Sequence, residues 1–245
     1  MSTPSRTAIV TGASRGIGAA IARRLGADGF NVIVNYASGA TQAAQVVAQI
    51  EAAGGRARAV AADVTDALSM RVLFDHAEDS FGKVDVLVNN AGISRMSALA
   101  QVTDEDFAGQ MAVNVTGTFN GMREGAKRIR DGGRIVNLST SIIGHYQPGT
   151  GVYAATKAAV EAMTHTLAKE LGTRRITVNA VAPGPVGTDL LLNGRPPEVI
   201  QRLVDDIPLG RLGETDDIAR IVSFLAGPES TWVNGQVIKA NGGRN

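Results

Sequence analysis

Apolar positions along the chain fall into short runs that alternate with longer stretches of helical periodicity. The short runs lack the strict alternation of apolar and polar residues found in strands with one face in water, so they are predicted to be strands buried on both faces. These runs are TAIVT, NVIVN, RAVAADV, VDVLVNN, RIVNLS, ITVNAVAP and GQVIKANG. Helices are predicted over 15–29, 39–53, 67–82, 103–130, 152–172 and 215–226.

Alternation of buried strands and helices predicts a single α/β domain over residues 1–245. Its expected architecture is a Rossmann-type doubly wound parallel sheet of about seven strands, with helices on both faces. One long segment that looks irregular, 184–213, follows the sixth strand. Because ligands of such sheets bind at the carboxyl ends of the strands, this segment is predicted to be a substrate lid.

Composition narrows the class of protein. The 245 residues, 44% of them apolar, suffice for one large core, and the net charge of +1 without a basic block argues against nucleic-acid or membrane partners. The absence of cysteine excludes disulfides and thiolate catalysis, and three scattered histidines predict no metal site. No apolar run is long enough to span a membrane. We expect a cytoplasmic protein that acts on small molecules.

A glycine-rich turn follows the first strand. TGASRGIG places Gly12, Gly16 and Gly18 between that strand and the next helix. This arrangement lets the backbone approach a pyrophosphate, whose charge a helix N-terminus favours. A plain tight turn is the alternative, and the spacing departs from the usual G-x-G-x-x-G. The order of strand, turn and helix nevertheless predicts a dinucleotide site.

Charge near this turn distinguishes the two nicotinamide cofactors. An acidic residue about 20 positions after the glycines would bind the 2′-hydroxyl of NAD. No Asp or Glu occurs between Asp28 and Glu51, and the second strand instead leads into Tyr36 and Ser38. Arg15 adds a positive charge unless it is only a solvated turn residue. The sequence therefore favours NADP(H) over NAD(H).

Tyr153 and Lys157 stand four residues apart in YAATK, at the start of a predicted helix. Residues at this spacing share one helical face. An ammonium about 4 Å from the phenol, at an effective dielectric near 20, would supply about 4 kcal/mol, enough to lower the tyrosine pKa by about 3 units. The alternative is a solvated lysine beside a half-buried aromatic residue.

The glycine spacing, NNAG at 89–92 and YAATK at 153–157 together resemble the short-chain dehydrogenase/reductase family, and more narrowly its 3-oxoacyl-carrier-protein reductases. The resemblance extends from Thr11 to the closing NGQVIKANGG. It implies that Tyr153 is the acid for reduction and the base for oxidation, that Lys157 holds the nicotinamide ribose, and that Asn114 kinks its helix and holds a water in the proton path.

The resemblance also implies a hydroxyl that donates a hydrogen bond to the oxyanion. The family's usual twelve-residue interval before Tyr153 leads to Thr140, whereas alignment on the turn SIIG selects Ser141. We assign Ser141, with Ser139 and Thr140 as alternatives. The remaining hydroxyls would be strand-end residues.

In similar enzymes the Asp of DV at 63–64 contacts adenine, the 89–92 backbone lines the nicotinamide ribose, and 183–188 holds the carboxamide. The cofactor contacts implied for this sequence are Gly12, Ser14, Arg15, Gly16, Ile17, Gly18, Tyr36, Ser38, Asp63, Val64, Asn89, Ala91, Gly92, Tyr153, Lys157, Pro183, Gly184, Val186 and Thr188.

The function expected from these features is NADPH-dependent reduction of a ketone or aldehyde, such as a 3-oxoacyl thioester or another small carbonyl compound. An NAD-dependent alcohol or sugar dehydrogenase is an alternative. A catalytically silent NADP(H)-binding regulator or scaffold is another, although such a protein has no need of the set Asn114, Ser141, Tyr153 and Lys157.

Position suggests the walls of the pocket: 93–98, the loop with His145, Tyr146 and Gln147, and the lid. Arg95 or Arg195 would suit an acidic substrate, unless each is a solvated loop residue. The helix after Tyr153 is rich in small apolar residues, which favours packing between subunits in a homotetramer over tight packing on its own sheet alone.

Overall fold

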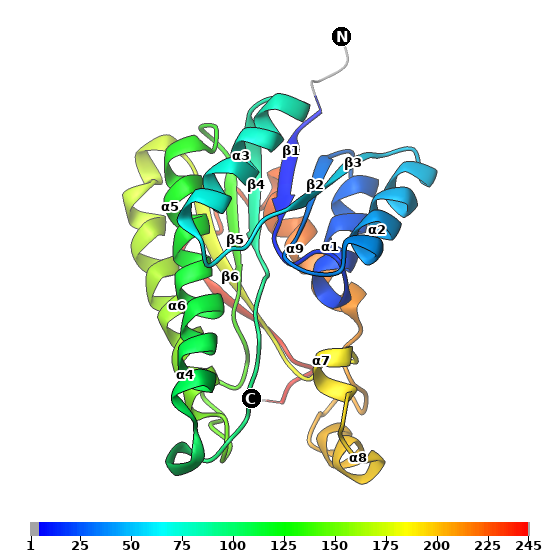
Figure 1. Cartoon of the computed structure of the whole chain (residues 1–245), viewed down its shortest axis with the longest axis vertical. Coiled ribbons are helices and arrows are strands. Elements are labelled where there is room, and N and C mark those ends of the chain that lie inside the picture. Colours follow the sequence, from blue (N-terminus) through cyan, green and yellow to red (C-terminus); the bar gives the residue numbers. More distant parts are fainter. Residues whose placement is uncertain (1–4, 245) are drawn as a thin grey trace.

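The structure is a computed structural model that describes residues 5–244, so both ends of the predicted 1–245 domain lie outside the described residues. Seven parallel strands form one sheet in the order β3-β2-β1-β4-β5-β6-β7 (Figure 1). The prediction of a doubly wound parallel sheet is confirmed. The strands are β1 Thr7–Val10, β2 Asn31–Tyr36, β3 Arg56–Ala61, β4 Val84–Asn89, β5 Arg134–Leu138, β6 Thr177–Pro183 and β7 Val237–Ala240.

Helices cover both faces of the sheet, with α1, α2 and α9 on one side and α3, α5 and α6 on the other (Figure 1). Each of these six corresponds to a predicted helix. Their bounds are α1 Gly16–Ala27, α2 Ala40–Ala52, α3 Ala67–Phe81, α5 Gly117–Arg128, α6 Gly151–Glu170 and α9 Thr215–Ala226. Short 3₁₀ turns cover Leu99–Gln101 (η1), Gly172–Arg174 (η3) and Pro228–Ser230 (η4).

The predicted helix over 103–130 is continuous in direction but changes its winding. It consists of α4 Asp104–Gln110, a π-helical turn over Met111–Thr116 (η2), and α5. Asn114 lies inside the π-helical turn and is fully buried. Such turns add a residue to the helix and often mark functional sites.

The central strands are buried on both faces, which explains their apolar sequences without alternation. Ile21 and Leu25 of α1 pack on one face, and Leu73 and Phe74 of α3 pack on the other, all fully buried. Burial of each such side chain contributes roughly 1.5–3 kcal/mol. The two helix layers therefore hold the sheet rigidly and fix the positions of its strand ends.

The segment 184–213 is more regular than its sequence suggests. It carries α7 Asp189–Leu192 and α8 Pro197–Asp205, where a proline at the first helical position suits the fixed φ of that residue. Both helices lie beyond the carboxyl ends of the strands, at the lower end of Figure 1. The segment thus stands where a lid would stand.

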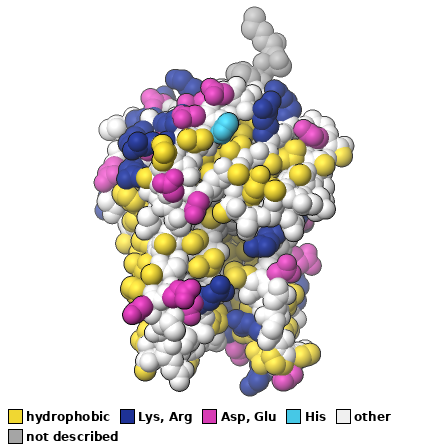
Figure 2. Space-filling model, viewed as in Figure 1, with side chains coloured by type: hydrophobic (Ala, Val, Ile, Leu, Met, Phe, Trp, Pro, Cys, Tyr) yellow, Lys and Arg dark blue, Asp and Glu magenta, His cyan; other side chains and the backbone are white. Residues whose placement is uncertain are grey.

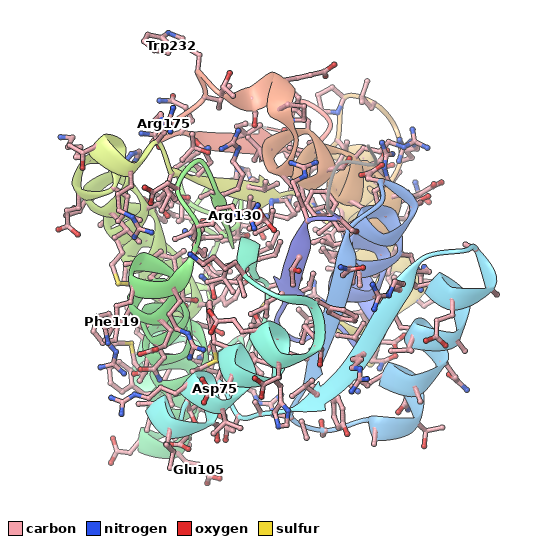
Figure 3. All side chains as sticks on the ribbon, turned by 90° about the horizontal axis from the view of Figure 1, so that it is seen from above. Asp75, Glu105, Phe119, Arg130, Arg175 and Trp232 are labelled. Atoms are coloured by element: carbon pink, nitrogen blue, oxygen red, sulfur yellow. The ribbon has the colours of Figure 1, made fainter. Side chains whose placement is uncertain are left out.

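Several large apolar side chains remain on the surface. Apolar atoms are spread over the side formed by α4, α5 and α6 (Figure 2). Phe119 of α5 is 44% exposed and Trp232, before β7, is 98% exposed, and both point outward in Figure 3. Within residues 5–244, no helix has the length and apolar character needed to cross a membrane.

Candidate active site

The turn after β1 is built from glycines at positions where a Cβ would clash. Gly12 and Gly16 have φ angles of 61° and 57°, which favour glycine. A Cβ on Gly12 would lie 2.9 Å from Ala91 Cα, and one on Gly18 would lie 2.4 Å from the Gly12 carbonyl oxygen. α1 begins at Gly16 without a side-chain cap, so its first N–H groups suit an anion such as a pyrophosphate.

Three polar residues that sequence reasoning did not single out hold this turn. Thr11 Oγ1 accepts hydrogen bonds from the backbone N–H groups of Asn90 and Ala91, at 3.0 and 3.1 Å. The Asn90 side chain donates to the carbonyls of Thr11 and Gly12. Asn35 Oδ1 accepts from the Gly12 N–H at 3.2 Å, while its Nδ2 donates to carbonyls at the end of β3. In the sequence Thr11 and Asn35 look like ordinary strand-end residues, whereas Asn90 belongs to the NNAG motif, of which only the backbone was expected to act.

The residues predicted to select the cofactor lie beside the turn. Arg15 is the exposed N-cap of α1, and Tyr36 is half-buried at the end of β2. Ser38 is exposed in the following loop, where a Cβ on Gly39 would lie 3.5 Å from Ser14 Oγ. The loop after β2 therefore packs against the turn after β1.

Asp63 and Val64 line the end of β3. The Asp63 carboxylate accepts from the Thr65 N–H and hydroxyl, each at 2.9 Å, and so shapes the loop. Val64 is buried against Gly117, where a Cβ would lie 2.6 Å from the valine side chain. Asn89, the last residue of β4, is buried and donates through Nδ2 to Asn137 Oδ1 at 2.8 Å.

The loop after β4, the π-helical turn and α6 come together at Gly92, which lies close to Asn114 and Lys157. A Cβ on Gly92 would lie 3.3 Å from Asn114 Oδ1 and 3.4 Å from Lys157 Nζ. The Asn114 side chain accepts from the Ile93 N–H and donates to the Ile93 carbonyl, both at 2.8 Å, and donates to Thr156 Oγ1 at 3.1 Å. The π-helical turn thus places a buried amide on the loop after β4.

Lys157 is buried, and its ammonium donates to the Leu138 carbonyl at 2.8 Å. Burial lowers the pKa of Lys157 from 10.5 to about 8, because the charged form loses contact with water. Its neighbour Tyr153 is half-buried, and burial raises the pKa of Tyr153 to about 12, partly offset by a hydrogen bond with the Thr140 side chain. In this structure the pKa of Tyr153 is therefore raised and not lowered as expected, because desolvation has the largest effect on both groups.

The structure separates the three hydroxyls at the end of β5. The Thr140 side chain has a hydrogen bond with Tyr153. Ser139 Oγ donates to Glu161 Oε1 at 2.6 Å, and the buried Ser141 donates its N–H to the Pro183 carbonyl at 2.9 Å. The contact with the phenol makes Thr140, the residue that the twelve-residue interval selects, a candidate for the oxyanion hydroxyl beside the assigned Ser141.

One stripe of α6 fastens the helix to the end of β5. Tyr153, Lys157 and Glu161 follow at intervals of four residues, and each contacts a residue within 138–140. Residues at this spacing lie on the same helical face. Glu161 was missed by sequence reasoning because an acidic residue in a helix normally indicates a solvated face.

The exit of β6 closes over the glycine turn. Pro183 ends the strand, and a Cβ on Gly184 would lie 2.7 Å from Asn241 Cα. Val186 is buried, and Thr188 Cγ2 is 3.7 Å from the Cβ position of Gly16. The cofactor residues predicted from three distant segments are thereby brought together at the carboxyl end of the sheet.

Three segments form the predicted pocket walls. Ser97 N–H donates to the Gly149 carbonyl at 3.0 Å, which joins the loops after β4 and β5. Tyr146 is 65% exposed with a φ of 25°, a strained conformation that is common at functional sites. Arg195, in the segment 184–213, reaches Met96. Among residues 5–244 no cluster of His, Cys, Asp and Glu is arranged to hold a metal ion.

Comparisons with known proteins agree with this geometry. The profile of the enoyl-(acyl carrier protein) reductase family matches residues 12–245. A chloroplastic NADPH-dependent aldehyde reductase-like protein of Arabidopsis thaliana is 42% identical, covering 97% of this chain and 93% of its own. The 3-oxoacyl-[acyl-carrier-protein] reductase of Staphylococcus aureus is 39% identical, covering 98% of each. A short chain dehydrogenase from Burkholderia cenocepacia, solved with NADP, has a TM-score of 0.93 at 40% identity, covering 99% of this chain and 98% of its own.

Proposed function

The chain belongs to the short-chain dehydrogenase/reductase family, and we propose that it reduces a ketone or an aldehyde with NADPH, using Tyr153 as the general acid. The observation that carries the proposal is the contact of the Tyr153 phenol with Thr140, one helical turn from a buried Lys157. A 3-oxoacyl thioester or another small carbonyl compound is the proposed kind of substrate.

Residues beside the glycine turn support NADPH. Arg15 offers an exposed guanidinium there, and Ser38 offers an exposed hydroxyl. No acidic residue between Asp28 and Glu51 would repel a 2′-phosphate. The Arabidopsis relative is named for NADPH, and the Burkholderia structure contains NADP.

When bound, the nicotinamide supplies a hydride to the carbonyl carbon. Tyr153 donates its phenolic proton to the carbonyl oxygen, which would otherwise become an alkoxide. The phenol carries its proton at neutral pH, as an acid for reduction must. A pKa raised by burial to about 12 also makes that proton harder to give up, so the positive charge of Lys157 is needed to stabilise the phenolate. In this proposal Thr140, which contacts the phenol, donates the hydrogen bond that stabilises the developing oxyanion, and Ser141 is the alternative donor.

Lys157 and Asn114 support this proton transfer. With a pKa of about 8, Lys157 is still mostly protonated at pH 7 and stabilises the phenolate that proton donation leaves behind. Asn114 holds the Ile93 backbone beside it and is proposed to place a water that returns a proton from solvent.

The remaining parts of the proposal concern the lid, assembly and location. Segment 184–213 would cover the substrate, since α7 and α8 stand over the strand ends. Exposed Phe119 and Trp232, on separate parts of the surface, would be covered by neighbouring subunits in a homotetramer. A cytoplasmic location completes the proposal.

The test is to titrate the purified protein with NADPH and with NADH while following nicotinamide fluorescence, and then to add ketones, aldehydes and acetoacetyl thioesters. We expect tighter binding of NADPH and turnover of carbonyl compounds. Tyr153→Phe should bind NADPH as the wild type does but lose turnover by about 10²-fold or more. Binding without turnover across the panel would overturn the reductase in favour of a regulator or scaffold.

A further inference from the structure

Arg195 lies in the lid between α7 and α8, and its guanidinium reaches across to the opposite wall of the pocket. Its Nη2 donates to Met96 Sδ at 3.3 Å, although the two residues are 99 positions apart in the chain. A thioether sulfur is a weak acceptor, and a guanidinium has five N–H donors. Among residues 5–244, no carboxylate lies within 4.0 Å of Arg195. A ligand carboxylate would therefore be a much better partner than the one it has.

The wall that Arg195 contacts is firmly held. The fully buried Gln110 accepts the Arg95 N–H through Oε1 at 3.0 Å, one helical turn before Asn114. Together with the Asn114 contacts to Ile93, this fixes both ends of the stretch 93–95 that leads to Met96. The Arg195 guanidinium is therefore held close to Met96, a residue of this wall that follows Gly92 by four positions.

Of the two arginines at this place, Arg195 is the one with no carboxylate within 4.0 Å among residues 5–244. The neighbouring Arg95 has the Asp106 carboxylate 3.7 Å away, which offsets its charge. A single unpaired guanidinium matches a group with one negative charge, and its planar fork suits the two oxygens of a carboxylate.

An apolar side chain, Met96, lies beside the guanidinium and is 46% exposed. Leu192, whose carbonyl accepts the Arg195 backbone N–H, adds an apolar side chain to the same segment and is 41% exposed. Four residues of chain from Gly92 to Met96 span at most about 14 Å. This limit keeps the carboxylate site within a distance of Gly92 that an aliphatic spacer between carboxylate and carbonyl can bridge.

We propose that Arg195 is the specificity residue of this site and that the preferred substrates are aldehydes or ketones bearing a carboxylate on a short aliphatic chain. The inference rests on the proposed reductase function. Binding of the carboxylate replaces the Met96 sulfur as the partner of Arg195, so the lid is held by the substrate itself.

The experiment compares succinate, glutarate and adipate semialdehydes with their methyl esters, in the presence of NADPH. For the best acid, we expect the wild type to have a higher kcat/KM than for its ester, and Arg195→Met to lower that value about 10- to 100-fold. The same variant should change kcat/KM for the ester less than about threefold. Arg195→Lys, which keeps the charge but not the fork, should fall between the two.

Arg202→Met is the matched control, because Arg202 belongs to the same lid and its Nε donates only to the Glu198 carbonyl at 3.3 Å. This variant should retain the preference for the acid. Equal turnover of acid and ester by wild type and Arg195→Met would overturn the role of Arg195 while leaving the reductase intact. Failure of every acid and ester to react, with other carbonyl compounds also inert, would instead overturn the proposed function.

Discussion

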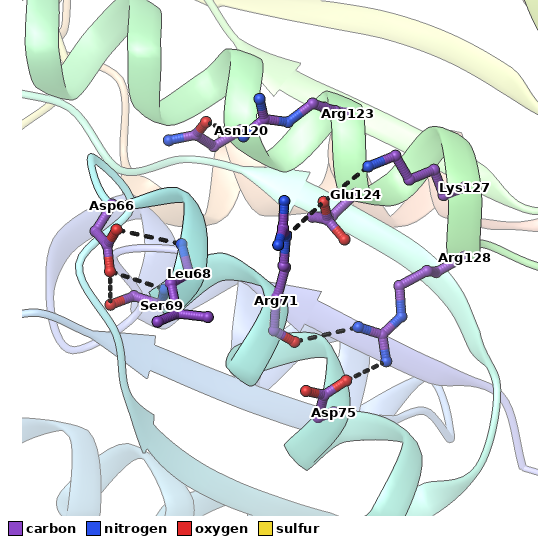
Figure 4. Close-up of polar contacts among 10 residues, drawn as sticks. All are labelled: Asp66, Leu68, Ser69, Arg71, Asp75, Asn120, Arg123, Glu124, Lys127 and Arg128. Atoms are coloured by element: carbon purple, nitrogen blue, oxygen red, sulfur yellow. Dashed lines mark hydrogen bonds and ion pairs between the residues drawn. The ribbon is translucent and has the colours of Figure 1, made fainter.

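At the amino ends of the strands, several arginines form ion pairs with carboxylates. At the carboxyl ends, Lys157 and Arg195 have no carboxylate partner among residues 5–244. Arg128 contacts Asp75 at 2.7 Å and Glu78 at 2.6 Å, and Figure 4 shows how it links α5 to α3. Arg130 and Arg174 also have carboxylate partners. Together with Arg128, they line a groove of about 470 Å³.

Two cations of the candidate site, Lys157 and Arg195, have neutral acceptors. Lys157 donates to a carbonyl and Arg195 to a thioether, and within residues 5–244 neither has a carboxylate within 4.0 Å. A paired cation links elements of the fold, whereas a cation held by a neutral acceptor keeps its charge for a ligand. Along one sheet, the paired arginines at the amino ends therefore contribute to stability, and the two cations at the carboxyl ends are left to interact with a ligand.

The largest effect on activity is expected from removing Lys157. Lys157→Met should lower kcat by about 10²-fold or more, because the phenolate left by Tyr153 loses its nearby positive charge. The same change should not lower the urea midpoint at pH 7, because it removes a buried charge that costs free energy in the folded state. A large loss of stability would show that Lys157 is structural as well.

Substitutions of Thr140 test whether its hydroxyl contributes to catalysis. Thr140→Val keeps the shape of the side chain but removes the hydroxyl, so kcat should fall about 10²- to 10³-fold in steady-state assays. Thr140→Ser should restore turnover to within a few-fold of the wild type. If Ser141→Ala has the larger effect, the hydroxyl assigned from the sequence is the functional one.

The pH dependence of stability tests the burial of Lys157. Its folded pKa of about 8 lies below its usual 10.5, so between these values the unfolded chain binds a proton that the folded chain does not. Stability therefore rises with pH in that window, and the wild type should gain about 3 kcal/mol relative to Lys157→Met. Urea unfolding of both proteins at pH 7.5 to 10.5 measures this difference, and parallel curves would contradict it.

The smallest expected effect is at the amino ends of the strands. Arg128→Met should lower the free energy of unfolding by about 1–2 kcal/mol, since two carboxylates lose their partner, and should leave kcat unchanged. Lys127→Met on the same helix is a control, because Lys127 is exposed and contacts only Glu124 at 3.2 Å. A fall in kcat for Arg128→Met would mean that the two ends of the sheet are not independent.

The sheet and its six main helices were predictable because their evidence is local. Strands buried on both faces require continuous apolar residues, as in β4, and Gly12 is required by its positive φ and by its approach to Ala91. The gathering of Tyr153, Lys157 and Asn114 followed from a resemblance across three motifs, and the structure places them together.

Other features depend on contacts between distant residues. The choice between Thr140 and Ser141 turns on a shift of one residue at the end of β5, which the sequence leaves open. Gln110 and Glu161 are polar helix residues whose partners lie elsewhere in the chain. The pKa of Tyr153 depends on burial, which a pair of residues four apart does not reveal.

Trp232 has a consequence for spectroscopy. It is the only tryptophan of the chain and is 98% exposed, just before the edge strand β7. An indole already surrounded by water emits at nearly the same wavelength in the folded and the denatured chain. The emission of Trp232 will therefore change little on unfolding. The same emission should shift to the blue when another subunit covers that edge, which makes this residue a built-in reporter of assembly.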